Sequence, residues 1–272
     1  PSENGDGKDN SKRPDKMKLS VDALSVAGPV RENNEDMLSI AGRMLRDKAL
    51  LLTDENAGDY WYAFVADGMG GHERGDSARA ELLEHLRDCF TMGDFSEEDF
   101  EVDFIRAVEY ISARLNAHSA YLGLEKPMGT TLCGIVWYYG KAYMVNAGDS
   151  RIYCWHDGLL EQLSEDQEDS CGLLTNCVGG NLAGTPAVRE ITGEIGEDDM
   201  LVICSDGISD FVPADEIEYY LTISGNPAAD ICDRAVVNGG TDNASVAVIR
   251  IGGGVFGDGD VPDDDGRFDA WA

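Results

Sequence analysis

The acidic residues best placed to do chemistry stand at the ends of predicted strands. Asp67 and Asp206 each close an apolar run and are followed by glycine, whereas Asp36 and Asp242 stand just before such a run. Asp149 closes a further run. Strand ends can meet at one edge of a sheet, and glycine lets backbone carbonyls approach a ligand, so the pattern favours a carboxylate cluster. Asp-Gly is also a common turn dipeptide, which is the alternative for any one of these acids.

A cluster of carboxylates without His or Cys selects hard cations. Oxygen-only coordination suits Mg²⁺ or Mn²⁺, whereas zinc prefers nitrogen or sulfur ligands. Two such ions can deprotonate a bridging water and neutralise the oxygens of an in-line displacement at phosphorus. Arg31 could bind the phosphate with its fork of donors, although a surface arginine is the alternative. We therefore expect a phosphate-ester hydrolase centred on Asp67, Asp206 and Asp242.

Strands must carry these acids, and apolar runs with period-two alternation predict where they lie. The expected strands cover residues 19–27, 37–40, 60–66, 131–139, 142–147, 152–155, 200–204 and 244–251. Apolar residues at helical spacing predict helices over residues 77–90, 100–122 and 227–237. His118 lies on the apolar stripe of the second helix, so we expect it to be packed or partly buried.

The composition is that of a globular protein with a sizeable core, because 43% of the residues are hydrophobic and 8% are aromatic. We expect one catalytic domain over residues 18–256, with disordered tails over 1–17 and 257–272. No apolar run approaches the roughly 20 residues that cross a bilayer, and no leader pattern opens the sequence. Seven scattered cysteines, an odd number, indicate reduced core thiols in a cytoplasmic protein.

The formal net charge is −31 at pH 7. Such a field repels nucleic acid and anionic membrane surfaces and attracts divalent cations or basic peptides. Most of these charges are expected to serve solubility. We therefore expect neither a nucleic acid nor a membrane as a partner.

Six motifs, taken in order, resemble the motif series of the metal-dependent, type 2C serine/threonine protein phosphatases of bacterial type. They are Arg-Glu-Asn-Asn-Glu-Asp at 31–36, Val-Ala-Asp-Gly-Met-Gly-Gly-His at 65–72, Gly-Thr-Thr at 129–131, Asn-Ala-Gly-Asp-Ser-Arg at 146–151, Ser-Asp-Gly-Ile-Ser-Asp at 205–210 and Thr-Asp-Asn-Ala-Ser at 241–245. The resemblance covers residues 25–250. It implies an α+β fold, in which a two-sheet antiparallel β-sandwich is flanked by helices on both sides in four αββα layers.

The resemblance also implies roles for individual residues at a cleft at one end of the sandwich. Asp67 bridges two Mn²⁺ or Mg²⁺ ions, the Gly68 carbonyl binds one of them, and Asp206 and Asp242 complete the other. Arg31 binds the substrate phosphate. The remaining positions are Glu35 and Asp36, which hold metal-bound waters or bind directly, Asp149, which could support a weaker third ion, and Thr130, Ser205 and Asn243, which shape the surroundings of the ligands.

Two departures from the family pattern bear on mechanism and substrate. Met69 stands where some members have a histidine that could protonate the leaving alkoxide. A metal-bound water could be the acid instead, or the leaving group could tolerate the absence of an acid. His72, three residues on, is expected to make a structural hydrogen bond. The flap of several dozen residues is largely missing, because residues 164–169 are followed almost at once by 173–180, and this predicts a more open cleft.

The expected activity is removal of phosphate from phosphoserine and phosphothreonine in proteins, opposing a cognate serine/threonine kinase. One alternative is a catalytically weak relative that regulates or binds phosphoproteins, although positions 67, 206 and 242 all keep aspartate. Another alternative is a hydrolase of small phosphate esters, which the missing flap favours.

Overall fold

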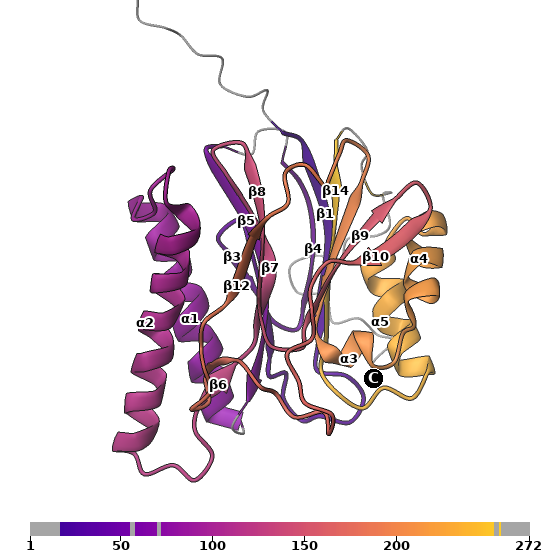
Figure 1. Ribbon diagram of the computed structural model, residues 1–272. Coiled ribbons are helices and arrows are strands. Elements are labelled where there is room, and N and C mark those ends of the chain that lie inside the picture. The colour runs from indigo at the N-terminus through magenta and orange to yellow at the C-terminus, as the bar shows by residue number, and fades with distance from the viewer. Residues whose placement is uncertain (1–16, 55–57, 70–71, 253–255, 257–272) are drawn as a thin grey trace, which may run out of the picture.

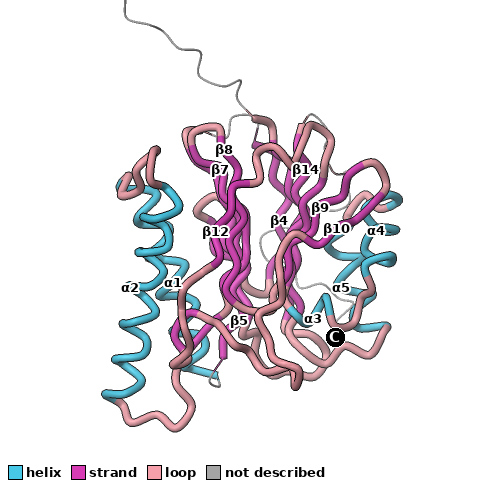
Figure 2. The backbone as a smooth tube through the Cα atoms, in the orientation of Figure 1, coloured by secondary structure: helices cyan, strands magenta, loops and turns pink. Residues whose placement is uncertain are grey.

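Two antiparallel β-sheets lie face to face, and helices cover the outer face of each (Figure 1). The computed structural model describes residues 17–54, 58–69, 72–252 and 256. The tails predicted over 1–17 and 257–272 therefore lie outside the described residues, apart from Met17. Figure 2 shows the layers in the order helix, strand, strand, helix. The fold is the predicted four-layer α+β sandwich.

The first sheet has the strand order β10-β9-β13-β14-β1-β4. Its strands are β1 (Leu19–Val26), β4 (Lys48–Asp54), β9 (Arg151–His156), β10 (Leu159–Gln162), β13 (Met200–Cys204) and β14 (Ala244–Ile251). β14 pairs with β1 on one side and with β13 on the other. Because Cys204 pairs with Val246, the end of β13 and the start of β14 lie at the same end of the sheet.

The second sheet has the order β11-β6-β5-β7-β8-β12, with β2 beside β5 and β3 beside β2. Its strands are β2 (Asp36–Ile40), β3 (Arg43–Leu45), β5 (Tyr60–Met69), β6 (Gly129–Thr130), β7 (Leu132–Tyr138), β8 (Lys141–Ala147), β11 (Val178–Gly179) and β12 (Ala187–Glu190). The first residue of β2 lies beside the C-terminal part of β5, because Asp36 pairs with Asp67.

Helices complete the two outer layers. α1 (His72–Met92) and α2 (Phe100–Tyr121) cover the second sheet. α3 (Asp206–Ser209), α4 (Ala214–Ile223) and α5 (Pro227–Val237) lie on the side of the first sheet. The helix predicted over 77–90 begins earlier than expected, at His72, and continues to Met92.

Side-chain alternation along β5 explains how the layers hold together. Trp61 and Val65 point into the core between the two sheets, whereas Tyr62 and Phe64 point into a second core beneath α1 and α2. A third core separates α4 and α5 from the first sheet. Both faces of each sheet are therefore buried, which is why the central strands read as nearly continuous apolar runs.

Short and exposed strands account for most elements absent from the prediction. β10 and β12 are edge strands with mostly exposed residues, so they carry no apolar pattern. β6 and β11 have two residues each. β4, with three successive leucines, did carry a usable signal.

The expectation of a packed His118 is wrong, since this side chain is exposed. The buried stripe of α2 passes from Leu115 to Ser119, four positions on, instead. The Ser119 hydroxyl accepts a hydrogen bond from the Met128 amide at 2.9 Å. A polar residue with a specific partner thus occupies the place that hydrophobicity alone assigned to the histidine.

All seven cysteines are free thiols, as predicted, and six of them are buried. Cys171 differs because it is exposed. None of the helices in the described part of the chain is long and apolar enough to cross a membrane.

Candidate metal centre

The aspartates at the strand ends come together at one end of the sandwich. Asp36 and Asp67 are direct partners across β2 and β5. Asp206 begins α3 just beyond β13, and Ser205 before it donates a buried hydrogen bond to Asp36 Oδ2 at 2.6 Å. This bond joins the two sheets. The folding of the strands therefore does what the sequence predicted, which is to bring these acids to one place.

Burial and mutual repulsion raise the pKa values of the aspartates in this cluster. Burial raises the pKa of Asp67 well above its usual range, and the charges of Asp36, Asp206, Asp149 and Asp242 raise it further. Burial raises the pKa of Asp206 to about 7, together with the charges of Asp36, Asp149, Asp242 and Asp210. Burial also raises the pKa of Asp36 to about 6, against the opposing effect of its hydrogen bond from Ser205. Carboxylates in this situation are stabilised by a bound cation, because it neutralises the charge that burial penalises.

The donor set fits Mg²⁺ or Mn²⁺ chemically. Its charged groups are carboxylates, and Asp149 Oδ1 is buried without a hydrogen-bond partner. The side chains do not enclose an ion as they stand, since no three His, Cys, Asp or Glu residues of the described chain are so arranged. Asp242 Oδ2 contacts Arg31 and Asp36 Oδ2 contacts Ser205, so a metal ion would compete with these contacts for those two oxygens.

A loop that precedes β2 holds Arg31 against this cluster. The Arg31 guanidinium lies 2.5 Å from Asp242 Oδ2. Asn243 anchors the loop, because its Nδ2 donates to the carbonyls of Ala27 and Asn33 and its Oδ1 accepts from the Glu35 amide. Three hydrogen bonds from one side chain thus hold the arginine's loop beside Asp242.

Gly28 explains how the loop can lie so close. Its φ of +75° suits glycine, and a Cβ there would lie 2.2 Å from the Asp242 carbonyl oxygen. Any larger residue at position 28 would push the loop away from the cluster.

Two threonines fix the backbone around Asp67. Thr130 Oγ1 donates to the Asp67 carbonyl at 2.9 Å. Thr131 Oγ1 accepts from the Asp67 amide at 3.0 Å and also contacts the Ser150 hydroxyl. Thr131 and Ser150 were not among the predicted site residues, although both lie inside motifs that resemble those of the family, at 129–131 and 146–151. Gly68, the expected carbonyl ligand, donates its amide to the Glu35 carbonyl at 2.9 Å.

Arg79 is a third residue that the sequence did not single out. It lies on α1 and is fully buried, with its guanidinium on the carbonyls of Asn34 and Glu35. Its spacing of three and four from Leu82 and Leu83, which are buried, was the available signal. The side chain of His72, for which a hydrogen bond was expected, lies outside the described residues.

The short segment after β10 packs on the turn that carries Asp149. Asp166 forms a forked ion pair with Arg151, at 2.7 Å for the closest atoms. The Gln167 amide donates to the Gly148 carbonyl and its side chain accepts from the Gly148 amide, both at 3.0 Å. The segment after β10 therefore supports the Asp149 turn.

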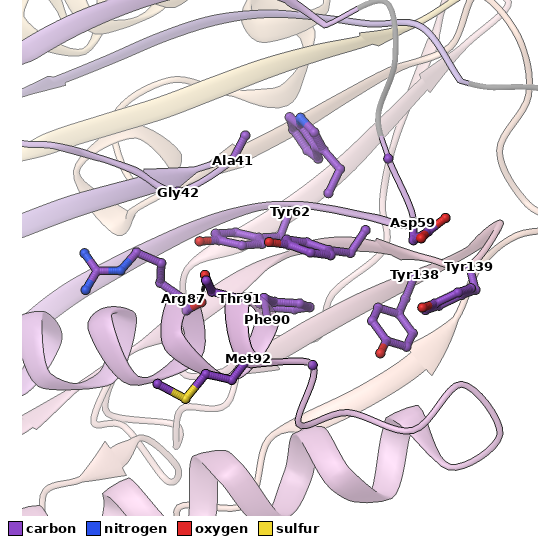
Figure 3. A pocket seen from close by; sticks show the side chains of 14 residues that line it. Ala41, Gly42, Asp59, Tyr62, Arg87, Phe90, Thr91, Met92, Tyr138 and Tyr139 are labelled. Carbon is purple, nitrogen blue, oxygen red and sulfur yellow. Dashed lines mark hydrogen bonds between the residues drawn. The ribbon is translucent and has the colours of Figure 1, made fainter.

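A hollow of about 490 Å³ lies elsewhere, at the opposite end of β5 (Figure 3). Tyr60 and Tyr62 line it together with Phe90 and Arg87 of α1. Asp67 lies near the other end of the same ten-residue strand. This aromatic hollow is therefore separate from the carboxylate cluster.

Comparison with known proteins agrees with the geometry. The family model described as protein phosphatase 2C matches residues 40–230. The serine/threonine phosphatase stp of Listeria monocytogenes serotype 4b is 27% identical over 249 residues, covering 82% of this chain and 92% of the relative. The serine/threonine protein phosphatase PstP of Mycobacterium tuberculosis is 28% identical over 257 residues, covering 86% of this chain and 45% of the relative.

Solved structures give the same result. The catalytic domain of the serine threonine protein phosphatase PstP, in complex with 2 manganese ions, superposes with a TM-score of 0.68 at 26% identity, covering 87% of this chain and 100% of that one. The S. agalactiae serine/threonine phosphatase has a TM-score of 0.73 at 22% identity, covering 85% and 99%, and supports the fold alone. Since the family model matches well over half of its residues, the chain belongs to the protein phosphatase 2C family.

Proposed function

We propose that this protein removes phosphate from phosphoserine and phosphothreonine in proteins and that it needs two Mn²⁺ or Mg²⁺ ions to do so. One observation carries the proposal: the β-sandwich of this family brings together four aspartates at one end, Asp36, Asp67, Asp206 and Asp242. Two relatives named as serine/threonine phosphatases, and a neighbour solved with two manganese ions, support it.

The proposed ligands are those that the strand ends supply. Asp67 and the Gly68 carbonyl, together with Asp206 and Asp242, would hold the two ions. Glu35 and Asp36 would hold metal-bound waters or bind the ions directly. Asp149 would support a weaker third ion. When bound, such ions lower the pKa of water and neutralise charge around phosphorus.

Arg31 is the proposed phosphate-binding residue. Its guanidinium already lies beside Asp242, on a loop that Asn243 fixes, and its side chain is about half exposed. A planar fork of donors in that place can bind two phosphate oxygens at once. Met69, at the end of β5, has no proton to give, so the leaving oxygen must take its proton from another group.

The partners we propose are phosphorylated proteins made by a serine/threonine kinase. The overall charge of −31 argues against nucleic acid and anionic membranes as partners. Six buried free thiols support a cytoplasmic setting. We also propose that residues 18–256 form the catalytic domain and that residues 1–17 and 257–272 are tails.

Hydrolysis of small phosphate esters is a second candidate. It is supported by the shortness of the segment between β10 and β11, which leaves little chain to select a protein substrate. A purely regulatory role has less support, since all the expected metal aspartates are present and adjacent.

Turnover of p-nitrophenyl phosphate tests the proposal. We expect hydrolysis with Mn²⁺, none with excess EDTA, and loss of turnover in Asp206→Asn, which keeps the size but removes the charge. The exposed Asp215→Asn is the matched control and should retain full activity. Metal-independent turnover, or none with any divalent ion, would contradict the enzymatic proposal. A phosphothreonine peptide hydrolysed no better than the small ester would favour the second candidate.

A further inference from the structure

Arg79 is the largest fully buried side chain in the described part of the protein, and it is charged. Burial of a guanidinium is costly unless acceptors satisfy its N–H groups. Two main-chain carbonyls are among the acceptors here, since Nη1 donates to the Glu35 oxygen and Nη2 to the Asn34 oxygen, the latter at 3.1 Å. One side chain of α1 thus binds two consecutive carbonyls of the loop that leads into β2.

These carbonyls lie where β2 and β5 meet at the metal centre. They directly precede Asp36, whose carboxylate accepts a hydrogen bond from Ser205. The Glu35 carbonyl also accepts the Gly68 amide at 2.9 Å. Arg79 and Gly68 therefore share one acceptor, and this acceptor links the start of β2 to the part of β5 that carries Asp67.

Two adjacent carbonyls are best bound by a side chain with two N–H donors at a fixed spacing. The guanidinium has a rigid planar fork, whereas the lysine ammonium is a single point with movable donors. Lysine at this position would retain the charge but could not reproduce the fork. The charge itself would oppose metal binding, because a buried positive group repels a nearby cation. The arrangement therefore favours geometry as the reason for an arginine here.

We propose that Arg79 is a positioning residue of the metal centre. By fixing the Asn34 and Glu35 carbonyls, it sets the spacing between the Asp36 carboxylate and the Gly68 main chain. It acts through the loop and does not touch metal or substrate. This inference rests on the proposed function, because it assumes that the cluster binds divalent ions.

Calorimetric titration of EDTA-stripped protein with Mn²⁺ tests this role without using activity. We expect Arg79→Lys and Arg79→Met each to weaken Mn²⁺ binding about tenfold or more, as loss of a ligand-orienting contact does elsewhere. Arg87→Lys is the matched control, because Arg87 lies on the same helix, is partly exposed and contacts Asp88. Its Mn²⁺ affinity should equal that of the wild type.

A second measurement separates positioning from a general effect on the fold. If Arg79 acts through the residue 34–36 loop, Arg79→Lys should cost less Mn²⁺ affinity in an Asp36→Ala background than in the wild type. Equal losses in both backgrounds would overturn the proposal. So would tighter Mn²⁺ binding by Arg79→Met with unchanged binding by Arg79→Lys, the result expected from charge alone.

The remaining outcomes are also decisive. Far-UV circular dichroism establishes whether each variant folds, and failure of both Arg79 variants to fold would assign the residue to the fold and overturn the proposal. Unchanged Mn²⁺ affinity in both variants would overturn this inference and leave the proposed function intact. A wild-type protein that binds no Mn²⁺ would overturn both.

Discussion

Arg31 and the carboxylates have opposite tasks within a few ångströms of one another. The arginine is the proposed phosphate-binding residue, and it lies 2.5 Å from Asp242, a proposed metal ligand. Because Arg31 and the carboxylates lie side by side, one phosphate could contact the guanidinium and the metal ions together. Hydrogen bonds from Asn243 hold the backbone of the loop, so the fold keeps Arg31 within reach of Asp242.

Removal of Arg31 should therefore weaken substrate binding. A bidentate hydrogen bond to a charged group contributes about 1.5–3 kcal/mol, so Arg31→Ala should raise KM for p-nitrophenyl phosphate roughly tenfold to a hundredfold. The change in kcat should be smaller. Arg189→Ala, an exposed arginine paired with Glu194, is the control with unchanged KM. An unaltered KM in Arg31→Ala would remove this residue from the site.

Asp22, which is not among the proposed metal ligands, provides a test of how stability depends on pH. It is buried on β1, accepts the Ala228 amide of α5 at 2.8 Å, and has its pKa raised by burial to about 6. The folded protein thus binds this proton more tightly than the unfolded chain. The resulting stability is present below about pH 4 and is lost as the pH rises through about 6.

Asp22→Asn should abolish this dependence and keep the acceptor for Ala228. Relative to the wild type, its free energy of unfolding should rise by about 2–3 kcal/mol between pH 4 and pH 7.5. Urea unfolding in EDTA measures this difference, and the exposed Asp215→Asn serves as control. A constant difference between Asp22→Asn and wild type across this range would contradict the assigned cause.

At the scale of elements, the close approach of the Arg31 loop to β14 depends on Gly28. Gly28→Ala adds a Cβ 2.2 Å from the Asp242 carbonyl, so the loop must shift. We expect kcat/KM to fall at least tenfold. Gly42→Ala is the matched control, because φ there is also positive, +83°, but nothing lies within 4 Å of the added carbon. That variant should lose only about 1–2 kcal/mol of stability and keep its activity. Equal activity in the two variants would contradict the role of the close approach.

Strand ends could be predicted from sequence because buried strands leave long apolar runs and the acids follow them directly. Asp67 and Asp206 were found in this way, and the structure brings them together. Side chains that bind main-chain groups of the centre were harder to predict from sequence. Arg79 reads as one more arginine on a helix, and only the path of the residue 34–36 loop, which depends on tertiary packing, makes it part of the centre.

Polar residues that satisfy a specific partner also escaped prediction. Ser119 occupies a buried position of α2 because it accepts the Met128 amide, and Thr131 bonds the Asp67 amide. Hydrophobic periodicity has no information about such pairs. Edge strands such as β12 escaped for the converse reason, since exposure removes the pattern that would have marked them.

For the whole molecule, the net charge of −31 has two components that respond differently to ions. Exposed acids repel one another at long range, and about 0.15 M salt largely screens them. The buried cluster around Asp67 is screened much less, because water and counter-ions are excluded from it. A divalent cation bound at the cluster should therefore stabilise the protein in a way that monovalent salt cannot.

Thermal unfolding at fixed ionic strength can separate the two components. Mn²⁺ at a hundred times its Kd should add about 2.7 kcal/mol to the stability of EDTA-treated protein. Asp67→Asn should lose most of this Mn²⁺ effect and keep the effect of NaCl. Without metal, the variant should be at least as stable as the wild type, because it lacks a buried carboxylate that its neighbours repel. A Mn²⁺ shift that NaCl reproduces, or that Asp67→Asn retains, would mean that the ion acts on the surface and not at the cluster.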